Sequence, residues 1–209
     1  GIAAVEALLV DGINVNITLL FSVERYEQIA LAYMSALERR KLAGQPLAGV
    51  ASVASFFLSR IDTRVDEQLR EKLAGGMGRA ERLLGKCAIA NAKIAYRRFT
   101  ELTSSGRWRA LEGAGARPQR LLWASTSTKN PAYDDLMYVE PLIGPQTINT
   151  LPRKTIAALA DHGKVTASLE QGSDQAVQVM RDLQRAGIDV PQITRQLLDD
   201  GIAKFVDSL

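Results

Sequence analysis

An amide and a hydroxyl lie two residues apart in a short apolar segment near the start of the chain, at Asn16 and Thr18. Alternation with period two gives this strand two faces: Ile17, Leu19 and Phe21 on one, and Asn16, Thr18, Leu20 and Ser22 on the other. Polar groups on a buried strand must find hydrogen-bond partners, because an unpaired one costs free energy. The pattern is therefore typical either of polar groups satisfied inside a core or of a functional site.

A lysine among hydroxyl residues, Lys129, is the second candidate for chemistry. It follows an apolar strand expected at 121–126, at the end of the strand where barrel enzymes place catalytic groups. A lysine that forms a Schiff base needs a deprotonated amine, together with a carboxyl group and a water to move protons. The residues alone leave Lys129 open as a nucleophile or a surface charge. Ser55 and Arg60, at the end of another apolar segment, are by themselves a strand serine and a surface arginine.

The remaining reactive side chains favour structural roles. His162, the single histidine, is expected in the last turn of a helix, where an imidazolium suits the helix dipole. Cys87, the single cysteine, excludes an internal disulfide and is typical of a small buried residue in a reducing compartment. No metal-ligand spacing, phosphate loop or dinucleotide fingerprint occurs. Four carboxylates are interpreted as helix-end or loop residues: Asp62, Asp66, Asp134 and Asp135.

These candidates are positioned by alternating strands and helices. Strands are predicted at 13–21, 50–58, 121–126 and 147–151. Helices are predicted at 1–10, 22–42 with Ser22 as N-cap, 61–105 with a break at 75–78, 152–162, and 173–187 with Ser173 as N-cap, followed by two helical pieces up to 209. Alternation of this kind indicates parallel βα units and an α/β fold.

The composition describes an ordinary globular chain. Its 209 residues are 46% hydrophobic and 23% charged, and the net charge of +3 is too small to indicate nucleic-acid binding. The basic residues between 79 and 120 are interpreted as a solvated helix face. No apolar run is long enough for a membrane span and no signal peptide is evident. We expect a cytoplasmic protein with no nucleic-acid or membrane partner.

Two motifs resemble one enzyme family. Residues 12–22, Gly-Ile-Asn-x-Asn-x-Thr-Leu-Leu-Phe-Ser, resemble the fifth barrel strand of transaldolases, the Schiff-base aldolases of the pentose phosphate pathway. Residues 122–131, Leu-Trp-Ala-Ser-Thr-x-Thr-Lys-Asn-Pro, resemble the seventh strand in one branch of the same family. The resemblance implies a (β/α)8 TIM barrel, and an enzyme that transfers a dihydroxyacetone unit between sugar phosphates. It implies no metal or organic cofactor.

The resemblance also assigns site residues. Asn16 and Thr18 match the substrate-side amide and the threonine that positions the catalytic water. Ser55, Arg60 and Ser125 match residues that hold the substrate phosphate. The commoner family pattern has an arginine closely after this last serine, where the chain has Thr-Ser-Thr-Lys. Lys129 is therefore assigned to the phosphate rather than to the Schiff base, because a phosphate-binding lysine must stay charged.

The same alignment sets an expectation for the rest of the barrel. The pair Gly1-Ile2 matches the end of the motif that carries the Schiff-base lysine on strand four. We therefore expect residues 1–209 to be the C-terminal part of a single barrel domain, strands five to eight. Its partner would be the N-terminal half, as a separate chain or another segment of the polypeptide, and a homodimer stays open. Alone, the chain would be inactive. The alternative is a non-catalytic half-barrel that binds phosphosugars or proteins.

Overall fold

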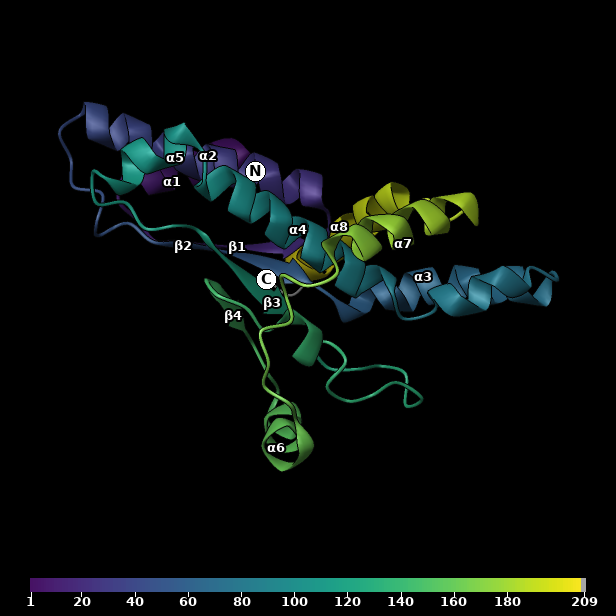
Figure 1. The fold of residues 1–209 in the computed structure, drawn as a ribbon. Coiled ribbons are helices and arrows are strands. Elements are labelled where there is room, and N and C mark those ends of the chain that lie inside the picture. The colour runs from purple at the N-terminus through teal and green to yellow at the C-terminus, as the bar shows by residue number, and fades with distance from the viewer. Residues whose placement is uncertain (208–209) are drawn as a thin grey trace.

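The computed structural model of the protein describes residues 1–207 and contains one parallel sheet. Its strands are β1 (Val15–Leu20), β2 (Ser52–Phe57), β3 (Arg120–Ala124) and β4 (Thr147–Asn149). Each strand pairs with the next one along the chain, so that the order is β1-β2-β3-β4 (Figure 1). Parallel neighbours require crossover connections, and helices occupy the connections from β1 to β3. The predicted α/β class with parallel units is confirmed.

The helices lie mainly on one side of this sheet. They are α1 (Ile2–Val10), α2 (Val23–Leu42), α3 (Ser59–Ala74), α4 (Cys87–Thr103), α5 (Gly106–Glu112), α6 (Arg153–His162), α7 (Ser173–Arg185) and α8 (Val190–Val206), with 3-10 turns η1 (Gly78–Leu83) and η2 (Glu140–Leu142). In Figure 1, α1, α2, α4 and α5 lie together above the sheet, and α6 stands apart beyond β4. None of the helices within residues 1–207 has the length and hydropathy needed to cross a membrane.

The hydrophobic core lies between the sheet and these helices. On the covered face Ala54, Phe56, Leu121 and Trp123 are fully buried, and the Phe56 and Trp123 rings meet edge to face at 6.1 Å. On the opposite face of β1, Asn16 and Thr18 are exposed. The expectation that these two polar groups sit on a buried strand is therefore wrong for this structure, because helices cover only the other face.

The predicted alternation along β1 breaks at Leu19. This residue has a φ of +60°, and the register with β2 shifts between Ile17 and Leu20. As a result Leu20 pairs with Phe56 on the covered face, instead of sharing the face of Asn16. An irregularity of this kind re-aims the side chains at the end of a strand.

The predicted helix ends are confirmed in part. Ser22 caps α2 by accepting a hydrogen bond from the Arg25 N–H at 3.2 Å. Ser173, in contrast, is the first residue of α7, whose N-cap is Gly172 with a φ of +71°. The predicted serine cap is wrong because the left-handed glycine turns the chain into the helix one residue earlier.

Two predicted helical boundaries also differ. The part of the predicted 61–105 helix that follows the break at 75–78 is divided into η1 and α4 by a turn at Gly85, which has a φ of +65°. The tail forms one helix, α8, instead of two pieces; Asp189 caps it by accepting from Gln192 N–H at 2.9 Å. Pro191 fits the first turn, where a missing N–H breaks no helical bond. Residues 208 and 209 of the expected tail lie outside the described residues.

Candidate active site

The open face of the sheet brings two of the candidate residues into contact. Ser55 on β2 donates a hydrogen bond to Asn16 Oδ1 on β1 at 2.7 Å. Ser55 is buried while Asn16 is exposed, so the serine holds the amide in place and leaves its N–H2 group free for the open face. Thr18 lies on the same strand, exposed, and its hydroxyl has no partner within residues 1–207. Ser55 thus orients the amide in this structure, and its phosphate contact stays a prediction.

A strained residue directly follows β3, which ends at Ala124. Ser125 has a φ of +56°, a conformation that costs a non-glycine residue about 1–3 kcal/mol and that clusters at functional sites. Its carbonyl accepts from Ser59 N–H at 3.0 Å, and its Oγ lies 2.8 Å from Ser59 Oγ. These contacts hold Ser125 against the first turn of α3. The structure therefore joins the ends of β2 and β3 through two serines.

Arg60 follows Ser59 directly and extends into solvent. Its guanidinium carbon lies 5.3 Å from the centre of the Phe57 ring, at a cation–π distance. Within residues 1–207 no carboxylate pairs with it. An arginine beside the end of a strand, whose five N–H donors have no hydrogen-bond partner in the part of the chain that the structure describes, is suited to binding a phosphate group.

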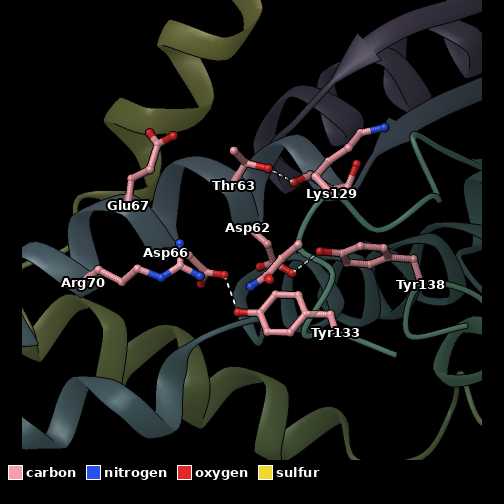
Figure 2. Close-up of a pocket in the computed structure, with 10 residues that line it drawn as sticks. Asp62, Thr63, Asp66, Glu67, Arg70, Lys129, Tyr133 and Tyr138 are labelled. Carbon is pink, nitrogen blue, oxygen red and sulfur yellow. Dashed lines mark hydrogen bonds between the residues drawn. The ribbon is translucent and has the colours of Figure 1, made fainter. Parts of the chain in front are cut away.

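Lys129 lies in the segment that follows β3. Its Nζ donates to Ser127 Oγ at 2.9 Å, and the side chain is exposed. It lines a hollow of about 330 Å³ between this segment and α3, together with Ser59, Asp62, Asp66 and Tyr133 (Figure 2). Arg60 does not line this hollow; it lies in the first turn of α3, so the two phosphate candidates lie on separate elements.

Sequence reasoning missed a pair of buried contacts in this hollow. Asp62 Oδ2 accepts from the Tyr138 hydroxyl at 2.9 Å, and Asp66 Oδ2 accepts from the Tyr133 hydroxyl at 2.5 Å. The other carboxylate oxygens accept from backbone N–H groups at the start of α4 and in the turn before it: Asp62 Oδ1 from Ala88 at 2.8 Å, and Asp66 Oδ1 from Gly85 at 2.9 Å. Asp62 lies in the first turn of α3, as the helix-end interpretation requires, but Asp66 lies inside the helix, where that interpretation is wrong; both carboxylates are buried.

Burial sets the electrostatics of this cluster. It raises the pKa of Asp62 to about 6, against the lowering effect of the hydrogen bonds from Ala88 and Tyr138. Burial also raises the pKa of the Cys87 thiol well above its ordinary range, and the nearby charges of Asp62 and Asp66 add to that shift. A thiol held protonated is a poor nucleophile, which confirms Cys87 as a buried structural residue.

A signal for the cluster was present in the sequence. Ile61, Val65 and Leu69 form the buried stripe of α3, and Asp62 and Asp66 each follow one member of it. Carboxylates four residues apart at the edge of an apolar stripe share one helix face. Their tyrosine partners lie some seventy positions further on, and no local pattern identifies them.

The fold and the site together define a class. Four parallel strands with helices between them, and polar side chains at the carboxyl ends of the strands, are compatible with an α/β barrel, in which functional residues lie at that end. The comparison with family models agrees with this class. The chain belongs to the transaldolase/fructose-6-phosphate aldolase family, whose model matches residues 1–209.

Individual relatives are similar along almost the whole chain. The transaldolase of Trichodesmium erythraeum is 50% identical over 213 residues, which cover 99% of this chain and 56% of that protein. Transaldolase 2 of a Nostoc species is 48% identical over 99% of this chain, and the transaldolase of Mycolicibacterium paratuberculosis is 46% identical over all of it. The chain spans 56% of the length of each of these relatives.

Proposed function

We propose that this chain forms part of a transaldolase, an enzyme that transfers a dihydroxyacetone unit from a ketose phosphate to an aldose phosphate. Family membership and the oriented Asn16 amide on the open face of the sheet support this proposal. The four strands are proposed as strands five to eight of a (β/α)8 barrel, and the open face as the face toward the barrel interior. The other half of that barrel is the proposed partner, because within residues 1–207 one sheet face lacks a helical cover and the outer edges of β1 and β4 pair with no further strand.

The phosphate end of the substrate is assigned to the carboxyl ends of β2 and β3. Arg60, whose guanidinium lies 5.3 Å from the centre of the Phe57 ring, provides a planar fork that matches two phosphate oxygens. Ser125 provides a hydroxyl held in a strained conformation beside Ser59. Lys129 adds a charge from the following segment. These groups anchor the substrate so that its carbonyl end extends across the open face.

The carbonyl end is assigned to Asn16 and Thr18. In the proposed reaction a lysine amine attacks the ketone carbon and water leaves, which gives a Schiff base. The Asn16 N–H2 group is free to donate to a substrate hydroxyl, and Thr18 offers a hydroxyl to the water that moves protons. The resemblance assigns the lysine and the acidic groups to residues other than 1–209, so that turnover would require both halves of the barrel.

Borohydride reduction in the presence of fructose 6-phosphate tests this proposal. Reduction traps a Schiff base as a stable amine, which intact mass and peptide mapping then locate. We expect an adduct on a lysine outside residues 1–209 when both halves are present, and none on the 209-residue chain alone. An adduct on Lys129 would overturn the assignment of that lysine to the phosphate. Binding without an adduct would favour a non-catalytic half-barrel.

Substitution of Arg60 tests the phosphate end separately. Arg60→Met removes the guanidinium and keeps an apolar chain against Phe57, and we expect KM for fructose 6-phosphate to rise about 10- to 100-fold. Arg64→Met is the matched control, because Arg64 is exposed on the same helix and pairs with Glu67 and Asp200. Equal effects of the two substitutions would contradict the assignment of Arg60.

A further inference from the structure

Two hydrogen bonds connect the segment between β3 and η2 to α3. The Tyr133 hydroxyl donates to Asp66, and the Tyr138 hydroxyl donates to Asp62. The Tyr133 ring also lies against the turn at Gly85, where an added Cβ would approach the ring at 2.9 Å. Lys129 lies in the same segment, four residues before Tyr133. The hydrogen bond from Tyr133 to Asp66 therefore limits the positions that the Lys129 side chain can reach.

The carboxylates of Asp62 and Asp66 on α3 compete with a substrate phosphate for the Lys129 ammonium. Asp62, Asp66 and Lys129 line one hollow, and an ion pair across it would hold the lysine away from a phosphate. Each of the four oxygens of Asp62 and Asp66 instead accepts a hydrogen bond from a tyrosine hydroxyl or a backbone N–H group. Glu67, the third carboxylate of α3 that lines the hollow, pairs with Arg64 at 3.6 Å. Within residues 1–207 Lys129 makes no ion pair, and Figure 2 shows its side chain extending away from Asp62 and Asp66.

We propose that Tyr133 is a positioning residue for the phosphate end of the substrate. Its hydrogen bond to Asp66 anchors the Lys129-bearing segment on α3 and occupies a carboxylate that would otherwise attract the lysine. Tyr133 itself does not touch the substrate and acts through Lys129. This inference rests on the proposed function, and it extends the site from the strand ends to a partner on α3.

Tyr133→Phe removes the hydroxyl and keeps the ring. We expect KM for fructose 6-phosphate to rise about tenfold in the assembled enzyme, as for loss of one charge-assisted contact, while kcat stays within about twofold. The constants for fructose, which lacks the phosphate, should not change. Tyr33→Phe is the matched control, because it removes a buried hydroxyl that donates to the Val50 and Arg117 carbonyls, far from the hollow. Its KM should equal that of the wild type.

A double-mutant cycle with Lys129→Met tests whether Tyr133 acts on substrate binding through Lys129. If Tyr133 acts through Lys129, Tyr133→Phe adds no further rise in KM once the lysine is replaced. Additive effects, or an equal loss for phosphorylated and unphosphorylated sugars, would overturn the proposal. The same cycle read as the Kd of fructose 6-phosphate by calorimetry gives this answer even if the enzyme performs no transfer. Failure of the proposed function is thereby separated from failure of the positioning role.

Discussion

Replacement of Asp62 by asparagine should make the protein's stability less sensitive to pH. Asp62 is 1% exposed, and its carboxylate accepts from Ala88 N–H and from the Tyr138 hydroxyl. Asparagine has nearly the same shape and keeps an oxygen acceptor, but it cannot ionise. The substitution therefore has two effects on the free energy of unfolding. The altered hydrogen bonds change it by the same amount at every pH. The cost of burying a charged carboxylate depends on pH, and the substitution removes it.

The size of this effect follows from the pKa. Burial raises the pKa of Asp62 from 3.8 to about 6, so the folded protein holds the proton more tightly than the unfolded chain. The resulting stabilisation is fully present below pH 3.8 and is lost as the pH rises through about 6. A shift of this size corresponds to roughly 3 kcal/mol in the free energy of unfolding. Relative to wild type, Asp62→Asn should gain about that amount between pH 4 and pH 7.

Urea denaturation at half-unit pH intervals measures this difference. The free energies of unfolding of the wild type and Asp62→Asn should diverge between pH 4 and pH 6 and run parallel above pH 7. Tyr138→Phe removes a hydrogen bond that lowers the pKa of Asp62 in the folded protein, so in that background the divergence should begin at the same pH and extend to higher pH. A constant difference across the whole range would refute the reasoning, since the hydrogen bonds would then fully offset burial.

Three further substitutions test local features. Ser22→Ala removes the N-cap of α2 and should cost about 1 kcal/mol in urea denaturation. Gly85→Ala should cost at least about 1 kcal/mol, because the residue has a φ of +65° and its new Cβ would meet the Tyr133 ring. Asp135→Asn should lower the pKa of His162, measured by NMR, because the hydrogen bond to Asp135 is the main cause of its rise.

Each of these has a contrary outcome. A neutral Ser22→Ala would mean that the exposed N–H groups of α2 are satisfied by water. A neutral Gly85→Ala would mean that Tyr133 moves at no cost. An unchanged His162 titration would assign its raised pKa to Asp161, which lies 3.2 Å away. The bond to Asp135 contributes stability only below the pKa of His162 and weakens as the pH rises through it.

Much of the fold could be predicted because its signals are local. Apolar runs bounded by glycine and polar residues located all four strands to within a few positions, and alternation with helices indicated their parallel pairing. The Ser22 cap was predictable because a serine followed by an acidic first turn favours a helix start. The candidate residues came from motifs; the structure brings Asn16 and Ser55 into contact, and the roles of these residues toward a substrate stay predictions.

The unpredicted features depend on distant or unusual conformations. Leu19 and Ser125 adopt positive φ values that local sequence disfavours for residues with a side chain. Ser173 has the chemistry of an N-cap, yet Gly172 takes that position in a left-handed conformation. The tyrosine partners of Asp62 and Asp66 depend on how the segment after β3 folds back on α3. Tertiary context decides each of these cases.

The order of the strands has a consequence for biosynthesis. Each new strand pairs with the one made just before it, so the sheet can grow in the direction in which the chain leaves the ribosome. Residues 58–119 separate β2 from β3. Protein synthesis adds about 5–20 residues per second, so the edge of β2 stays unpaired for on the order of several seconds before β3 is made. An unpaired strand edge invites association with another chain. The helices between these strands are thus synthesised while the edge of β2 is still open to such association.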